Sequence, residues 1–280
     1  MIIDGKKIAQ EILLYLKDEV DKLSIKPSIA VVIVGENPSS KIYVNLKQKK
    51  AMQIGMNSIV VEMPKDTTQK ELEDKIDELN QNPEINAILV QLPLPKHLDT
   101  YKILEKIDPI KDVDGFHPQN VGKLSIGLEP YSTSCTPKGV IRLLDAYNID
   151  IESKNVVVIG RSNIVGKPLA SMLLARNATV TIAHSKTLNI RAITQRADIV
   201  IAAVGSAHLV NSEWIKDKAV VIDVGISKTP DGKLLGDVDF DSVKDKASYI
   251  TPVPGGVGPM TIAMLLENTL HLYNLQKEQK

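Results

Sequence analysis

The chain has 280 residues, of which 43% are apolar, and its 34 Lys and Arg balance its 34 Asp and Glu. This length can bury one large core or two modest ones, and the balanced charge offers neither a basic field to nucleic acid nor an acidic tail to basic partners. One cysteine, no signal segment and no apolar run near the roughly 18 residues that span a bilayer predict a soluble, cytoplasmic protein, with a small-molecule ligand and no membrane partner.

The first part of the chain alternates helical and strand patterns. Apolar periodicity predicts helices at 6–23, 39–54 and 68–79. Buried-strand patterns fall at 28–34, 58–63 and 87–91. This alternation predicts parallel βαβ units. The proline-rich stretch from Pro93 to Pro130 is expected to be irregular, with a domain boundary near Gly122.

The second part repeats the alternation. A helix is predicted from Thr136-Pro137 to about Tyr147, followed by strands at 156–159, 179–183, 199–202, 220–223 and 249–251. The fold class is therefore α/β, with two doubly wound domains, 1–121 and 122–280, and a cleft between them. We expect the second domain to be Rossmann-like and the terminal helix, about 259–280, to pack back on the first domain.

The stretch from Asn155 to Ala170, NVVVIGRSNIVGKPLA, combines a strand, a tight turn and a helix start. Open α/β folds hold a dinucleotide at such a place. Only Gly160 and Gly166 represent the G-x-G-x-x-G pattern, and a strand-to-glycine turn also occurs in α/β proteins that bind no cofactor. The loop alone therefore predicts a nucleotide site without naming the nucleotide.

The next strand ends in His184-Ser185-Lys186, where NAD-selective sites usually carry an acidic residue. Arg161, Ser185 and Lys186 could instead offer a guanidinium, a hydroxyl and an ammonium to a ribose 2′-phosphate. The sequence therefore predicts an NADP site. His184 itself is more simply interpreted as a polar strand end.

Tyr43 and Lys47 lie four residues apart on a predicted helix and share one face. Such a pair could stack a planar ligand and transfer protons, but the neighbouring lysines make a solvated basic face the simpler interpretation of the spacing. A catalytic role for Lys47 requires burial, because desolvation favours a neutral amine.

Gln91 follows the third strand, at the end where ligands of parallel sheets lie. Its simpler interpretation is a polar strand terminus, and Asp112 and Asp114 are by default turn residues that bind nearby amides. Cys135 is interpreted as a buried, inert cysteine rather than an activated thiolate. The five histidines show no metal-ligand spacing, so no metal is predicted.

Five motifs occur in one order along the chain. They are Tyr43-x3-Lys47, Gln91-Leu-Pro-Leu-Pro, Lys111-Asp-Val-Asp-Gly-Phe, Gly160-Arg-Ser-x2-Val-Gly-x-Pro168 and Pro252-Val-Pro-Gly-Gly-Val-Gly-Pro-Met-Thr261. In this combination the chain closely resembles the bifunctional methylenetetrahydrofolate dehydrogenase/cyclohydrolase family over essentially its whole length.

The resemblance implies an NADP-dependent enzyme of one-carbon metabolism that serves purine, methionine and histidine biosynthesis. It implies oxidation of 5,10-methylenetetrahydrofolate to the methenyl form, followed by hydrolysis to 10-formyltetrahydrofolate. A homodimer is also expected, with a surface strand near Ile182 or Ile201 as a candidate interface. Two alternatives are a two-domain dehydrogenase similar to shikimate dehydrogenase, which would not explain the Gln91 motif, and a non-catalytic NADP sensor, which would be expected to have lost Lys47 or Asp114.

For folate, the resemblance implies that Lys47 is the central catalytic group. It further implies that Tyr43 stacks on the aminobenzoyl ring, Gln91 positions Lys47, and Asp114 holds the pterin. The chemistry agrees, because a partly neutral lysine can assist attack of water on a methenyl carbon and a carboxylate matches the paired N–H donors of a pterin.

For the cofactor, the resemblance assigns Gly160, Arg161 and Ser162 to the dinucleotide loop, Ser185 to the 2′-phosphate and Ile226 to a backbone contact near the nicotinamide. The folate cleft is expected to be lined by Pro254, Gly255, Gly256 and Thr261. Two departures from the family, Ser134 before Cys-Thr-Pro and Ser227 after Gly-Ile, concern local loop geometry.

Overall fold

The computed structural model describes residues 1–229 and 231–278. The chain forms two compact units, each built from two separate stretches. We call them the Lys47 unit, which comprises Glu11–Thr133 and the chain from Leu265, and the Gly160 unit, which comprises Met1–Gln10 and Ser134–Met264. The division at Thr133 and Ser134 lies later than the predicted boundary near Gly122, because the chain around Gly122 is helical.

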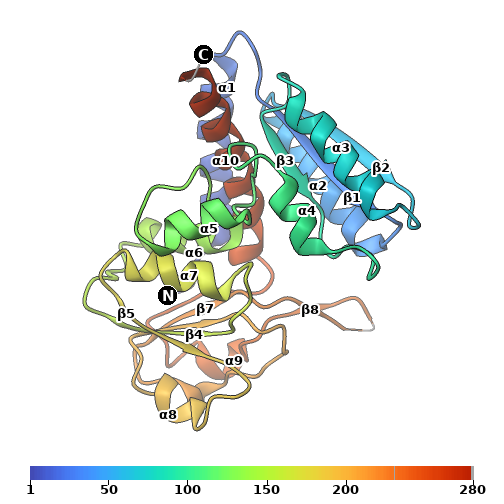
Figure 1. Cartoon of the computed structure of the whole chain (residues 1–280). Coiled ribbons are helices and arrows are strands. Elements are labelled where there is room, and N and C mark those ends of the chain that lie inside the picture. The colour runs from blue at the N-terminus through green and yellow to red at the C-terminus, as the bar shows by residue number, and fades with distance from the viewer. Residues whose placement is uncertain (230, 279–280) are drawn as a thin grey trace. The chain divides into compact units, whose positions relative to one another are not determined.

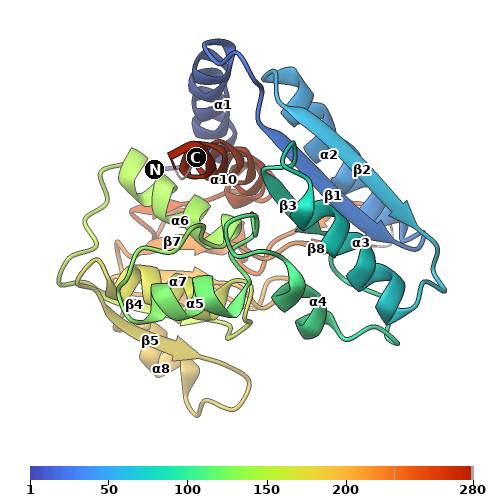
Figure 2. The ribbon, with the colours of Figure 1, turned by 45° about the horizontal axis from the view of Figure 1, so that its top comes forward.

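The Lys47 unit is a three-stranded parallel sheet of order β2-β1-β3 with helices on both faces (Figures 1 and 2). On one face, alternate residues of the central strand β1 pack against the helices α3 and α4. The other face contacts α2. The elements are α1 (Gly5–Asp21) from Glu11 onward, β1 (Ser28–Val34), α2 (Pro38–Gln53), β2 (Asn57–Met63), α3 (Gln69–Gln81), β3 (Ala87–Val90) and α4 (Thr100–Lys106).

The region predicted to be irregular contains two short helices, α4 and α5 (Pro118–Ser125). Both have local caps. The side chain of Asp99 accepts hydrogen bonds from the first backbone N–H groups of α4, and His117 Nδ1 accepts one from Gln119 before a proline at the first helical position. The prediction was wrong for α5 because Pro118, which starts that helix, was interpreted as a loop signal. It was wrong for α4 because this helix, which begins at Thr100, is only seven residues long.

The Gly160 unit is a five-stranded parallel sheet of order β10-β7-β6-β4-β5. Figure 1 shows α6 and α7 on one face and α8 and α9 on the other. The chain passes from β4 to β5 on one side and then returns to β6 on the other, so the order reverses at β4 and the sheet is doubly wound. The strands are β4 (Asn155–Ile159), β5 (Thr179–Ala183), β6 (Ile199–Ala202), β7 (Val220–Asp223) and β10 (Tyr249–Ile250).

The helices of this unit are α6 (Cys135–Ala146), α7 (Gly166–Leu174), α8 (Ile190–Thr194) and α9 (Phe240–Val243), with a 3-10 turn η1 (Ser212–Trp214). A small antiparallel hairpin of β8 (Ser227–Lys228) and β9 (Leu234–Leu235) was not predicted. Its strands of two residues are too short for an alternating pattern to be recognised. The N-terminus also joins this unit, since Ile2 bridges Ile250 in parallel and Ile3 N donates to Ile250 O at 2.8 Å.

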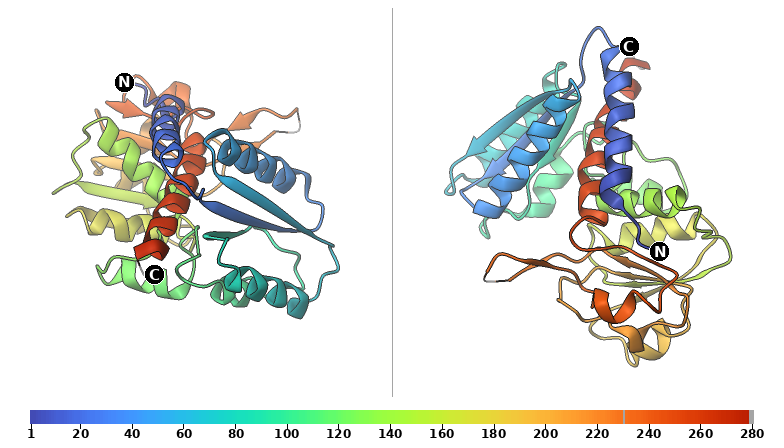
Figure 3. Two further views of the ribbon diagram at one scale, coloured as in Figure 1. Left: turned by 90° about the horizontal axis from the view of Figure 1, so that it is seen from above. Right: turned by 180° about the vertical axis from the view of Figure 1, so that it is seen from behind.

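The last helix, α10 (Val257–Glu278), is one continuous helix of 22 residues (Figure 3). It begins two residues before the predicted start at Pro259, and residues 279–280 of the prediction lie outside the described residues. In the Lys47 unit, Tyr273 Oη donates to Ile25 O at 2.7 Å and Gln276 Nε2 donates to Asn86 O at 2.8 Å. Among the helices of the described ranges, none is long and apolar enough to cross a membrane.

Candidate active and cofactor sites

Lys47 and Gln91 meet at the carboxyl edge of the Lys47 unit's sheet. Gln91 directly follows β3, and its backbone N–H extends the ladder by donating to Val32 O at 2.8 Å. Lys47 lies on the helix that follows β1, and its Nζ donates to Gln91 Oε1 at 2.9 Å. The order β2-β1-β3 reverses between these two strands, so the pair lies where open α/β sheets bind ligands.

The side-chain amide of Gln91 is held in one orientation. Its Nε2 donates to Leu92 O at 2.7 Å, which leaves Oε1 to accept from Lys47. Lys47 is half-buried rather than buried, and the Tyr43 ring, one turn earlier on α2, is 44% exposed. A positioned amine therefore lies near an aromatic ring that can contact a ligand.

Asp114 lies in a turn that follows a short segment beside β3. Ile88 N donates to Lys111 O at 2.7 Å, and Asp112 bridges Ile88 in parallel. The chain then turns, since Gly115 N donates to Asp112 O at 3.4 Å and Gly115 has φ +66°. Asp114 is therefore two residues past the bridge to β3, the strand that Gln91 follows.

Asp112 holds the turn that carries Asp114. Its carboxylate is 1% exposed and accepts hydrogen bonds from His117 N at 2.8 Å and Asn120 Nδ2 at 2.9 Å. Burial raises the pKa of the Asp112 carboxyl to about 6, an effect that these hydrogen bonds oppose. The prediction that Asp112 binds nearby amides is confirmed.

Lys111 has a structural role that the sequence pattern did not indicate. Its side chain is buried, and Nζ donates to three carbonyl oxygens at the end of α3, those of Leu79 (3.1 Å), Asn80 (2.6 Å) and Asn82 (2.8 Å). A cation at a helix C-terminus satisfies carbonyl groups that have no partner within the helix. Lys111 therefore anchors the start of the Asp114 segment.

The Gly160 loop requires glycine at two positions. Gly160 has φ +126°, and a Cβ there would overlap the carbonyl oxygen of Ala203 at the end of β6. A Cβ on Gly166 would likewise overlap the carbonyl oxygen of Gly160. The backbones therefore approach closely at the carboxyl ends of β4 and β6, where the strand order reverses. This is the crevice in which doubly wound sheets bind dinucleotides.

Ser162 Oγ accepts from Val165 N at 3.1 Å and from Gly166 N at 3.4 Å, and so closes the entry into α7. Arg161 is exposed beside it. At the end of β5, His184 and Thr187 close a turn, because His184 N donates to Thr187 Oγ1 at 3.0 Å. Ser185 is exposed in this turn, and no acidic residue accompanies it. These groups fit a phosphorylated ribose.

The glycine-rich segment before α10 is packed against the N-terminus. Gly255 has φ +106° and its carbonyl oxygen accepts from Lys6 N at 2.9 Å. A Cβ on Gly5 would overlap the carbonyl oxygen of Gly256, and one on Gly256 would approach Pro252 O to 2.6 Å. Packing thus explains part of this motif.

The remaining predicted residues of the Gly160 unit lie near the start of α10. Pro254 is exposed, and Thr261 Oγ1 lies 3.0 Å from Thr136 Oγ1. Ile226 is 44% exposed, and its side chain lies 3.6 Å from the position that a Cβ on Gly258 would take. The structure therefore places Ile226 against the first turn of α10.

Both departures from the family pattern make local hydrogen bonds. Ser134 Oγ donates to Ile164 O at 2.6 Å, in the Gly160 loop, and Ser227 Oγ donates to Gly205 O at 3.4 Å. Cys135, directly after Ser134, is buried. Within residues 1–229 and 231–278, no group of three or more His, Cys, Asp or Glu side chains could hold a metal ion.

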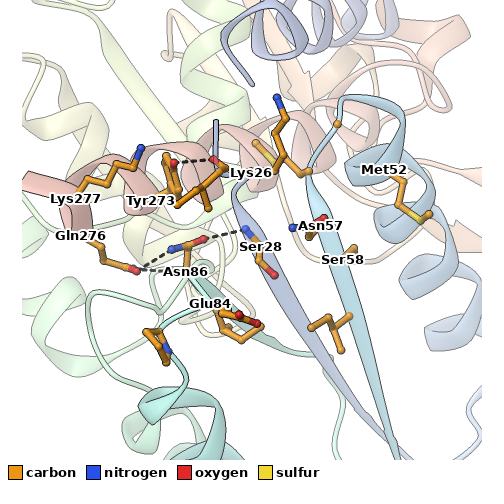
Figure 4. A pocket seen from close by; sticks show the side chains of 16 residues that line it. Lys26, Ser28, Met52, Asn57, Ser58, Glu84, Asn86, Tyr273, Gln276 and Lys277 are labelled. Atoms are coloured by element: carbon orange, nitrogen blue, oxygen red, sulfur yellow. Dashed lines mark hydrogen bonds between the residues drawn. The ribbon is translucent and has the colours of Figure 1, made fainter. Parts of the chain in front are cut away.

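A pocket of about 860 Å³ lies at the opposite edge of the Lys47 unit's sheet, where β1 and β2 begin (Figure 4). Asn86 joins two parts of its lining: Oδ1 accepts from Ser28 N at 2.9 Å, and Nδ2 donates to Gln276 Oε1 at 3.2 Å. These contacts fasten α10 to the strands.

Comparison with known proteins agrees with this geometry. Residues 3–114 match the family "Tetrahydrofolate dehydrogenase/cyclohydrolase, catalytic domain", and residues 134–277 match its "NAD(P)-binding domain". The chain is 55% identical, over 279 residues, to "Bifunctional protein FolD" of Thermodesulfovibrio yellowstonii, which covers 99% of this chain and 97% of that protein.

Solved structures give the same relationship. The bifunctional methylenetetrahydrofolate dehydrogenase/cyclohydrolase of Campylobacter jejuni superimposes with a TM-score of 0.97 at 48% identity, covering 98% of this chain and 99% of that one. The Trypanosoma brucei enzyme, solved with NADP and an inhibitor, has a TM-score of 0.93 at 42% identity, covering 98% and 97%. Shikimate 5-dehydrogenase of Thermus thermophilus, at 13% identity and a TM-score of 0.55 over 89% and 94%, is similar in fold alone.

Proposed function

Since this chain belongs to the tetrahydrofolate dehydrogenase/cyclohydrolase family, we propose that the residue clusters of its two units carry the two halves of that chemistry. The enzyme is bifunctional and uses NADP. It oxidises 5,10-methylenetetrahydrofolate to the methenyl cation and hydrolyses that cation to 10-formyltetrahydrofolate, in one-carbon metabolism. A shikimate dehydrogenase-like activity is set aside, because that likeness extends to the fold alone.

In the Lys47 unit, Lys47 assists hydrolysis. Water attacks the methenyl carbon and gives one proton to the amine of Lys47. The remaining hydroxyl proton passes to N5 as the bond from the carbon to N5 breaks and the C=O bond forms, which leaves the formyl group on N10. The observation that supports this role is the hydrogen bond of 2.9 Å from Lys47 Nζ to Gln91 Oε1, which fixes the amine at the sheet edge. Tyr43 stacks on the aminobenzoyl ring and Asp114 binds the pterin N–H donors.

In the Gly160 unit, NADP supplies the hydride acceptor. Gly160, Arg161 and Ser162 approach the phosphates, and Ser185 binds the 2′-phosphate beside the Arg161 guanidinium. Ile226 contacts the nicotinamide end through its backbone. We assign the folate contacts of this unit to Pro254, Gly255, Gly256 and Thr261, at the start of α10.

Lys47→Met tests the hydrolytic role, because methionine keeps the apolar stem and removes the amine. We expect hydrolysis of methenyltetrahydrofolate to be abolished while NADP binding, measured by calorimetry, stays unchanged. Lys49→Met, an exposed lysine of the same helix, is the matched control and should retain wild-type rates. An unchanged cyclohydrolase rate in Lys47→Met would falsify the assignment.

Arg161→Ala tests the phosphate contacts. We expect the variant to lose most of the preference for NADP over NAD, because the guanidinium pairs with the 2′-phosphate that NAD lacks. Steady-state kinetics with both cofactors measure the ratio. A ratio equal to that of the wild type would remove Arg161 from the site.

We further propose a homodimer in the cytoplasm, paired through β5. This strand is at the edge of its sheet, and its Ile182 side chain is 37% exposed with the 65% exposed Leu174 on the preceding helix. Ile201, the other predicted interface residue, is fully buried, so its strand is excluded. Ile182→Lys should shift the mass in analytical ultracentrifugation from dimer to monomer. A monomeric wild type would contradict the proposal.

A further inference from the structure

Asp237 is a fully buried carboxylate that organises the loop after β6. Its two oxygens accept hydrogen bonds from three successive backbone N–H groups, those of Val204 (2.6 Å), Gly205 (3.1 Å) and Ser206 (2.7 Å). These residues follow Ala203, whose carbonyl oxygen contacts Gly160 at the reversal of the strand order. One side chain thus fixes the backbone of a loop at the dinucleotide crevice.

The surroundings of the Asp237 carboxylate are buried, and both of its oxygens accept hydrogen bonds. Asp223, at the end of β7, is also buried and accepts from Asp237 N and Val238 N at 2.9 Å. A Cβ on Gly225 would overlap the Asp237 carboxylate. Within the described part of the chain Asp237 pairs with no cation, so the loop N–H groups are what offsets the cost of its burial.

The inward N–H groups set the direction of the carbonyl groups. In a trans peptide the C=O of one residue points opposite to the N–H of the next. Because the N–H groups of residues 204–206 point to Asp237, the carbonyl oxygens of residues 203–205 point away from it. Two contacts agree, since Ala203 O faces Gly160 and Gly205 O accepts from Ser227 Oγ.

We propose that Asp237 is a positioning residue of the NADP site. By binding the loop N–H groups, Asp237 holds the carbonyl oxygens of residues 203–205 toward the crevice. There these oxygens accept hydrogen bonds from the nicotinamide carboxamide and disfavour the binding of phosphate. The carboxamide offers two N–H donors and the oxidised ring is cationic, so a rim of acceptors matches this end of the cofactor. The phosphates then lie at Gly160 and Arg161, whose N–H groups and charge attract anions. This inference rests on the NADP site proposed above.

Asp237→Asn tests the proposal, because an amide in place of one carboxylate oxygen presents donors to a loop that needs an acceptor. We expect calorimetry to give at least tenfold weaker NADP binding and unchanged binding, within twofold, of adenosine 2′,5′-bisphosphate, which lacks the nicotinamide. Asp241→Asn, an exposed carboxylate nearby, should change neither affinity. Equal losses for both ligands, or no loss of NADP affinity, would overturn the proposal.

A failure of the proposed NADP site can be distinguished from a failure of the inference about Asp237. Arg161→Ala should weaken both ligands together, whereas Asp237→Asn weakens NADP alone. If Asp237→Asn does not fold, amide hydrogen exchange of the wild type tests the inference instead. The amides of residues 204–206 should be protected without ligand and unchanged by NADP, because they point to Asp237. Amides that exchange freely and become protected only with NADP would contradict the inference.

Discussion

Replacing Lys111 by methionine should destabilise the Lys47 unit strongly. The ammonium of Lys111 satisfies three carbonyl groups at the end of α3, and methionine preserves most of the apolar stem while leaving these acceptors without the donor. The bond to Leu79 O is buried, and the bonds to Asn80 O and Asn82 O are partly buried. Water can therefore replace the last two more easily than the first.

The expected loss follows from these exposures. A buried carbonyl without a partner costs about 1–3 kcal/mol, and each partly buried bond contributes about 0.5–1 kcal/mol. The lost charge at a helix C-terminus adds about 0.3–1 kcal/mol. Removing the desolvation cost of the buried ammonium offsets part of this sum. We expect the free energy of unfolding to fall by about 2–4 kcal/mol.

Urea-induced unfolding followed by circular dichroism measures the change. Lys106→Met is the matched control, because Lys106 makes an exposed ion pair with Asp77 and such pairs contribute little. A loss below about 1 kcal/mol for Lys111→Met would refute the reasoning, since it would mean that water replaces all three bonds.

Three further predictions concern Asp112, Gly160 and Gln91. The pKa of Asp112 is about 6 in the fold against 3.8 for an aspartate in water, so its charge opposes folding above pH 6 and this penalty fades as the pH falls toward 4. The difference in free energy of unfolding between wild type and Asp112→Asn, measured in urea, should therefore shift in favour of the wild type by about 1 kcal/mol from pH 7 to pH 5, and a constant difference would contradict the shifted pKa. Gly160→Ala should prevent NADP from raising the melting temperature, because its Cβ overlaps Ala203 O; a wild-type rise would contradict this. Gln91→Leu should slow hydrolysis of methenyltetrahydrofolate by about 10²-fold, as Lys47 loses its positioning partner, with NADP affinity as the control; an unchanged rate would contradict this.

The strands were largely predictable because each carries a local signal. The buried strands Ser28–Val34 and Val220–Asp223 are apolar except for one polar residue at one end, Ser28 in the first and Asp223 in the second. The edge position of Gln91 followed from the rule for parallel sheets. The bond from Lys47 to Gln91 joins residues 44 positions apart, and the resemblance, not the periodicity, indicated it.

What the sequence did not indicate depends on contacts between distant segments. Lys111 reaches the end of α3, about 30 residues earlier in the chain, and Asp237 binds amides more than 30 residues before it. Neither residue belongs to a pattern that periodicity detects, because each is a buried polar residue whose partners are backbone groups. Such residues become visible only when the backbone that they satisfy is known.

The N-terminal segment has a consequence for the order of synthesis. The Met1 ammonium donates to Ser248 O at 2.6 Å, across 247 residues of chain, and Ile2 bridges Ile250. These residues thus add to a sheet whose last strand, β10, is synthesised long after them. The Lys47 unit likewise includes the chain from Leu265, which is synthesised long after the rest of that unit. Neither unit is complete before its later stretch has been synthesised, so we expect nascent chains to depend on protection from aggregation until then.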